Sequence, residues 1–162
     1  MKVQRLLIIL GLITVFILCN VALAASTSTQ TVTFQVTAIN EIAASGNPAP
    51  LIVNTATAGA QPIAAINSAT TYAITTNETN KKITGVLDSA MPAGTTLKIN
   101  LAAPTGASSA GDVSLTNVAS DLVTAITKVA ESGKTITYTF SASIGAGVVA
   151  SSTRTVTLTI TN

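Results

Sequence analysis

The chain has 162 residues, of which 48% are hydrophobic and only 9% are charged, and its net charge is +2. So few charged residues argue against nucleic-acid binding, because that function needs clustered lysine and arginine to neutralise phosphates. The chain contains no histidine and a single cysteine, Cys19. This composition excludes Ser-His-Asp and Cys-His catalysis, and it excludes metal sites built from those side chains.

The first residues predict a secretory signal peptide. Lys2 and Arg5 precede an apolar run over residues 6–18, and the small residues Ala22 and Ala24 follow at the spacing that a signal peptidase reads. We predict a signal peptide over residues 1–24, cleaved after Ala24 or one residue later. The protein is then secreted, to the extracellular space or the cell surface, and it meets a membrane only through this segment before cleavage.

Two alternatives to a cleaved signal peptide stay open. An uncleaved anchor helix would need a longer apolar run than residues 6–18 provide. A lipid on Cys19 would need a small residue directly before it, and Leu18 occupies that position.

The exported part, residues 25–162, is predicted to be one domain without a disulfide. It has no cysteine, so its core alone must stabilise it. Six basic and six acidic residues remain in it, because Lys2 and Arg5 leave with the signal peptide. A net charge near zero favours self-association.

Period-two alternation predicts an all-β fold. Polar residues, mostly threonine, alternate with apolar residues in four segments, which is typical of strands with one face in a core and one face in water. These segments cover residues 31–37, 96–101, 135–141 and 155–161. The first carries Val32, Phe34 and Val36 on one face. Sheets with one covered face predict an antiparallel β-sandwich.

Weaker patterns fill the gaps between these strands. We predict further strands at residues 51–53, 71–76, 82–87 and 112–116. Turns are predicted at 77–80, as a hairpin, and at 91–94 and 132–134. Residues 102–111 are predicted to form a loop. Residues 118–129 fit either a strand or an amphipathic helix, and the strand is favoured.

No group of residues suggests catalysis, and we predict no enzyme activity, no cofactor and no metal site. The six acidic residues are scattered, and no calcium-loop or phosphate-loop motif is present. A hydrolase that uses two carboxylates brought together in space is the weakest of three function classes. Asn77-Glu78-Thr79 fits a glycosylation sequon but is interpreted as an ordinary loop.

The predicted terminal strands have few charges, and Arg154 is the one charged residue of the last when that strand is taken from Thr153 to Thr161. Uncharged strand edges suit the addition of a strand from another copy.

Three segments resemble major pilin subunits of the class 5 (alpha) chaperone-usher fimbriae. They are TVTFQVTAINEI at 31–42 followed by SGN at 45–47, YAITTNETNKKITGVL at 72–87, and RTVTLTIT at 154–161. The resemblance leaves out the proline-containing stretch 48–62. It implies an immunoglobulin-like sandwich completed by a donor strand from a neighbouring subunit. It also implies Val32, Phe34, Val36 and Ile39 as the donated face, and a periplasmic chaperone and usher as partners.

Two functions follow as expectations. The first is a non-enzymatic structural subunit of an extracellular or cell-surface fibre, pilus-like or part of a matrix, which assembles by β-strand addition. The alternative is a monomeric secreted β-sandwich that binds a surface ligand such as a glycan.

Overall fold

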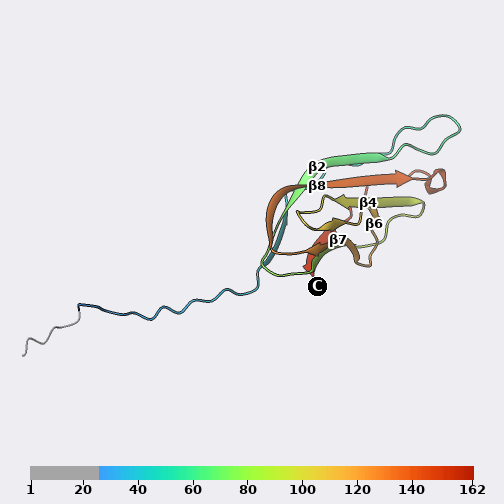
Figure 1. Ribbon diagram of the computed structural model, residues 1–162. Coiled ribbons are helices and arrows are strands. Elements are labelled where there is room, and N and C mark those ends of the chain that lie inside the picture. Colours follow the sequence, from blue (N-terminus) through green and yellow to red (C-terminus); the bar gives the residue numbers. More distant parts are fainter. Residues whose placement is uncertain (1–25) are drawn as a thin grey trace, which may run out of the picture. The chain divides into compact units, whose positions relative to one another are not determined.

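The computed structural model describes residues 26–162, so the predicted signal peptide over residues 1–24 lies outside the described residues. The chain forms two parts, an N-terminal segment that ends at Gln35 and a compact unit from Val36 to Asn162. Residues 26–35 contain no helix or strand (Figure 1). All regular structure described below belongs to the unit 36–162.

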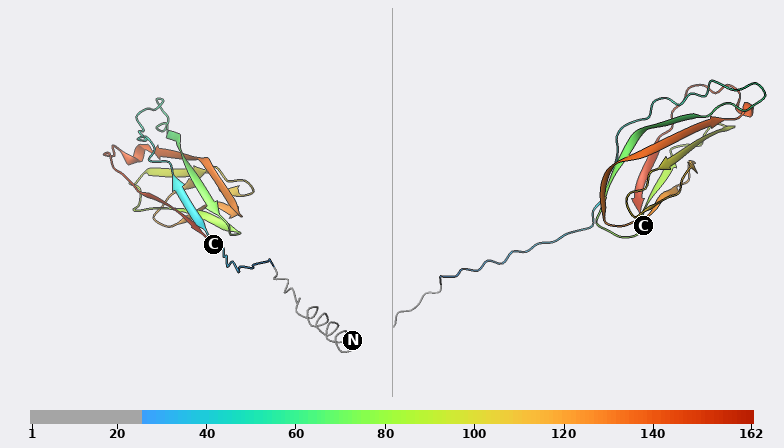
Figure 2. Two further views of the ribbon diagram at one scale, coloured as in Figure 1. Left: turned by 90° about the vertical axis from the view of Figure 1, so that its left-hand side faces the viewer. Right: turned by 45° about the horizontal axis from the view of Figure 1, so that its top comes forward.

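Two antiparallel sheets form a sandwich-like arrangement, which confirms the all-β prediction (Figures 1 and 2). One sheet has the order β1-β2-β8-β4-β6, and the other has the order β5-β7-β3-β9. The strands of the first sheet are β1 (Asn40–Ala44), β2 (Ala65–Thr76), β8 (Val129–Ala142), β4 (Thr95–Leu101) and β6 (Val113–Ser114). Those of the second are β5 (Ser108–Ser109), β7 (Ser120–Ile126), β3 (Lys81–Leu87) and β9 (Val156–Thr161).

The core lies between the sheets and is made of alternate residues of the longer strands. In β3 every second residue from Lys81 to Leu87 is buried, as the period-two pattern requires. The largest fully buried side chains are Tyr72, Ile74, Ile83, Ile99, Leu101, Leu122, Ile126, Ile136 and Val123. The Tyr72 hydroxyl is satisfied because it donates a hydrogen bond to the Ala102 carbonyl at 2.7 Å.

Most of the predicted strands are confirmed. The segments at 96–101, 135–141 and 155–161 correspond to β4, the second half of β8, and β9. Residues 71–76 and 82–87 correspond to part of β2 and to β3. The ambiguous segment 118–129 contains the strand β7, and the helical alternative is wrong. Residues 102–111 are mainly loop, with the two-residue strand β5 near the end.

The chain turns at 77–80 as predicted, but the hairpin predicted there is wrong, and the turn predicted at 132–134 is wrong. Residues 77–80 connect β2 to β3, but these strands belong to different sheets, so the connection is a corner and not a hairpin. Residues 132–134 lie inside β8, where Gly133 has a φ of 68°. The pairing moves from Tyr72↔Lys134 to Ile74↔Glu131, so β8 has one extra residue there. The glycine therefore forms a β-bulge, which lets a long strand bend without ending.

Three strand predictions need correction. Residues 51–53 form no strand, and their surroundings contain only an isolated bridge between Ala56 and Pro62. The strand predicted at 112–116 is reduced to β6. Residues 31–37 have a strand-like sequence but pair with no strand among the described residues. Their alternation predicts a strand whose apolar face packs against other residues. The pattern does not show whether those residues belong to the same chain or to another copy.

Candidate functional site

The second sheet ends in an open edge at β9. One side of β9 pairs with β3 over its whole length, from Leu87↔Val156 to Lys82↔Thr161. The other side has no partner strand within residues 26–162. An edge of this kind presents backbone N–H and C=O groups that another strand can bind.

The apolar face of β9 is only partly covered. Val156, Leu158 and Ile160 are half-buried and pack against the core, while Thr157 and Thr159 point to solvent. Arg154, which the sequence placed in this strand, lies just before it and donates a hydrogen bond to the Ala90 carbonyl at 3.0 Å. The strand itself therefore has no charge to discourage pairing with another chain.

The open edge lies on the side of the sandwich where β1 and β9 approach each other (Figure 2). β1 is the outer strand of its own sheet, and its Ile42 is half-buried against the core. The opposite side is closed by residues 102–115, where Ala110 N–H binds the Leu122 carbonyl and Leu115 N–H binds the Leu97 carbonyl, each at 2.9 Å. Loop contacts thus connect the two sheets on one side, while on the other side the edge strands β1 and β9 approach each other without pairing.

The residues of the predicted donated face are exposed. Val32 is 76% exposed, Phe34 is 90% exposed and Val36 is 80% exposed, while Ile39 is 42% exposed. Val32 and Phe34 belong to the N-terminal segment, and Val36 and Ile39 belong to the compact unit, directly before β1. Exposed apolar side chains at every second position are costly in water unless another surface covers them.

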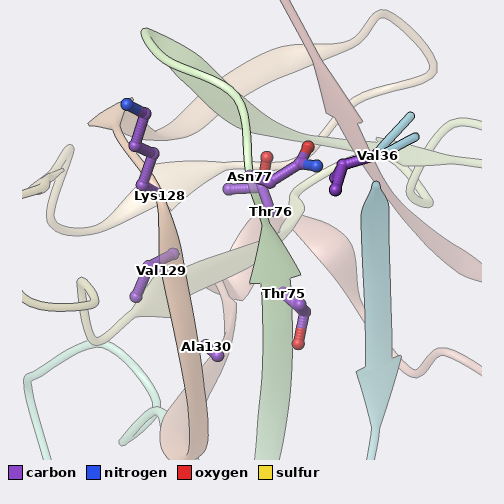
Figure 3. Close-up of a pocket in the computed structure, with 7 residues that line it drawn as sticks. All are labelled: Val36, Thr75, Thr76, Asn77, Lys128, Val129 and Ala130. Atoms are coloured by element: carbon purple, nitrogen blue, oxygen red, sulfur yellow. The ribbon is translucent and has the colours of Figure 1, made fainter. Parts of the chain in front are cut away.

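A shallow hollow lies at the end of β2 beside the start of the compact unit (Figure 3). Val36 forms one side of it, and Thr76, Asn77 and Val129 form much of the rest. Lys128 is its one ionisable residue. The hollow has no arrangement of acids and bases that could act on a substrate.

Six of the ionisable groups form three ion pairs, and Lys81 is buried in one of them. Lys81 Nζ lies 2.9 Å from Glu78 Oε2, Lys82 Nζ lies 3.1 Å from Asp121 Oδ1, and Lys134 Nζ lies 2.5 Å from Glu131 Oε2. No group of three or more acidic, histidine or cysteine side chains within the described chain could hold a metal ion.

Hydrogen bonding keeps the two paired glutamates ionised. Bonds from Asn40 and Lys81 lower the pKa of Glu78 below its ordinary value. A bond from Lys134, with further bonds from Thr105, lowers the pKa of Glu131 to about 2. Burial raises the pKa of Tyr72 to about 12, with a smaller contribution from the nearby charge of Glu131. The lowered pKa values of the two glutamates favour the folded state at neutral pH, whereas the raised pKa of Tyr72 keeps its buried phenol neutral and matters only at alkaline pH.

Asn77 has a role that the sequence pattern does not predict. The pattern places it in a hairpin loop, but its side chain binds the backbone of residues 37 and 39, just before β1. The residues around Asn77 give no signal for this contact, because the partners are 38 and 40 positions away.

No family model, curated protein or solved structure matches this chain. No helix among residues 26–162 is long and apolar enough to cross a membrane. The features available for assigning a function are therefore the open edge of β9 and the exposed segment that precedes β1.

Proposed function

We propose that the protein is a non-enzymatic structural subunit of an extracellular or cell-surface fibre. Residues 31–37 of one copy add as a strand to the open edge of β9 in the next copy. The observation that carries this proposal is that two parts of the chain have backbone groups available for strand pairing. Within residues 26–162, the strand-like segment 31–37 pairs with no strand, and one edge of β9 pairs with no strand.

The two elements match in length and chemistry. β9 has 6 residues, and the alternating segment spans residues 31–37. Val32, Phe34 and Val36 would lie beside Val156, Leu158 and Ile160, which are half-buried against the core, and would extend the cover over them. Covering each apolar side chain would contribute about 1.5–3 kcal/mol, and the added strand would satisfy a row of backbone groups.

The same proposal gives the finer description of the fold and its assembly. The sandwich is immunoglobulin-like and is completed by the neighbour's strand. Residues 1–24 direct export, and a periplasmic chaperone and usher handle the subunit before assembly. The pilin resemblance supports these partners, and the need to protect an open apolar edge during export agrees with them.

Size-exclusion chromatography of a chain that begins at Ala25 tests the proposal. We expect heat-resistant oligomers for the unmodified chain. Phe34→Asp would place an unpaired charge against an apolar surface, so it should give a folded monomer. A peptide of residues 26–38 added to this variant should bind to its open edge.

Val148→Asp is the matched control, because Val148 is also fully exposed but lies in the loop before β9. This variant should form oligomers like the unmodified chain. A chain that stays monomeric at high concentration, with residues 31–37 protected from proteolysis, would refute the fibre.

A monomeric binding module is the second candidate, and one observation favours it. Residues 45–64 and 143–153 contain no charged residue. They expose several apolar side chains, namely Ile52, Ile63, Ile144 and Val148. Such a surface could hold a ligand. Ligand binding by a strict monomer, lost in Val148→Asp and kept in Phe34→Asp, would favour this function over the fibre.

A further inference from the structure

Asn77 holds the chain at the point where it enters the first sheet. Its Nδ2 donates to the Thr37 carbonyl at 2.7 Å, and its Oδ1 accepts from Ile39 N–H at 2.9 Å. Its own backbone N–H donates to the Ile39 carbonyl at 3.3 Å. One asparagine thus satisfies three backbone groups of residues 37–39, in the way that a neighbouring strand would.

This contact continues the path of β1 beyond its last strand partner. The β1–β2 ladder ends at the pair Asn40↔Thr76, and Asn77 is the next residue of β2's chain. Residues 37–39 are therefore kept extended in line with β1.

A copy that filled its own open edge would need a different path at this point. β1 begins at Asn40 and lies beside β9. To lie along β9 of the same copy, residues 31–36 would have to reverse direction within residues 37–39. A tight reversal would break the bonds of Thr37 and Ile39 to the Asn77 side chain.

We infer that Asn77 is a positioning residue that prevents residues 31–37 from capping their own β9 and so directs them to another copy. The inference rests on the proposed fibre function. Residues 31–37 can bind the edge of β9 in their own copy, which is self-capping, or in another copy, which is polymerisation. The contacts of Asn77 favour the second outcome.

The corner that carries Asn77 is itself held in place. Asn40 Nδ2 donates to Glu78 Oε2 at 2.5 Å, and Thr76 Oγ1 donates to Asn40 Oδ1 at 2.8 Å. Lys81 pairs with Glu78 at 2.9 Å, and Lys128 N–H binds the Glu78 carbonyl at 2.9 Å. Because these bonds fix the residues on either side of Asn77, its side-chain amide has little freedom to move with residues 37–39 if they reverse direction.

The test compares Asn77→Ala with Asn100→Ala in the chain that begins at Ala25. Asn100 is a matched control because it also uses both amide atoms, with Asp112 at 3.0 Å and Ser109 at 3.4 Å, but it lies on β4. We expect Asn77→Ala to shift the ratio of oligomer to folded monomer about tenfold toward monomer, as the loss of two hydrogen bonds allows. Asn100→Ala should keep the ratio of the unmodified chain. Equal oligomer content in both variants would overturn the inference.

Chymotrypsin digestion at a concentration where every form is monomeric gives a second measurement. Phe34 is the exposed aromatic residue of residues 26–162, because Tyr72 and Tyr138 are buried and Phe140 is half-buried. We expect cleavage after Phe34 to be about tenfold slower in Asn77→Ala than in the unmodified chain, because the capped segment is protected. A merely structural role for Asn77 would instead make cleavage faster, and that result would overturn the inference.

The two measurements separate this inference from the fibre proposal. An unmodified chain that never forms oligomers refutes the fibre, while slower cleavage in Asn77→Ala still supports the control of self-capping. Normal fibres in Asn77→Ala refute the role of Asn77 and leave strand addition intact. Circular dichroism of both variants identifies loss of the fold. Asn77→Asp keeps the acceptor for Ile39 N–H but loses the donor to the Thr37 carbonyl, so it should also lower the ratio of oligomer to monomer and slow the cleavage after Phe34.

Discussion

Gly94 allows the loop between β3 and β4 to pack closely against the loop that follows β8. Gly94 lies between β3 and β4 with a φ of 75°, and its carbonyl accepts a hydrogen bond from Ser143 N–H at 2.9 Å. A Cβ at this position would lie 2.8 Å from the backbone of Ala146. Gly94 is therefore required for two reasons, its left-handed conformation and the close approach of another loop.

Gly94→Ala should lower the free energy of unfolding by about 2–4 kcal/mol, because it adds a clash with backbone to the cost of a left-handed alanine. Gly111→Ala separates the two causes, since Gly111 has a φ of 72° with nothing within 4 Å of its Cβ position. That variant should lose only about 1–2 kcal/mol. Urea unfolding of both variants measures the difference, and equal losses would contradict the role given to the close approach.

Glu131 makes stability depend on pH. The bond from Lys134 lowers its pKa to about 2, against an ordinary value of 4.5 in the unfolded chain. Its contribution is therefore complete above pH 4.5 and is lost as the pH falls toward 2. The urea midpoint of the unmodified chain should fall across this range, and Glu131→Gln should reduce the slope. Parallel pH profiles for the two proteins would contradict this account.

At the scale of elements, periodicity predicts strands well but not their partners. β4, the second half of β8 and β9 follow from alternating apolar residues, while β7 does not bury alternate residues and its segment also fitted a helix. The bulge at Gly133 was interpreted as a turn because glycine allows both, and only the long ladder between β2 and β8 distinguishes them. The chain reversal at residues 77–80 was expected, but the switch between sheets depends on contacts far away in the sequence.

The site was predictable in part for the same reason. Val32, Phe34 and Val36 follow from the alternation, and the low charge of the last strand indicated an edge open to pairing. The position of this edge beside β1, and the bonds of Asn77 to residues 37 and 39, required the fold. Polar contacts between distant residues leave no periodic signal in a single sequence.

At the scale of the whole molecule, the proposed connection between copies uses two parts of one chain. Within residues 26–162, β9 has a free edge and residues 31–37 pair with no strand; the apolar face of β9 is half-buried, and that of residues 31–37 is exposed. If these faces combine between copies, each subunit gives one strand and receives one, and the contact is heterologous. Repetition of a heterologous contact that does not close produces a filament. Under the proposed strand addition, fibre growth is therefore a consequence of the free edge of β9.

Cross-linking between isotopically distinct copies tests strand addition most directly. A photoreactive phenylalanine analogue would replace Phe34 in both 15N-labelled and unlabelled chains, which are then unfolded, mixed and refolded together. The account predicts cross-links from residue 34 to β9 (Val156–Thr161), including pairs that join a heavy peptide to a light one. Cross-links to β9 confined to peptides of the same isotope would show that each copy caps itself. No cross-link to β9 at all would contradict strand addition in any form.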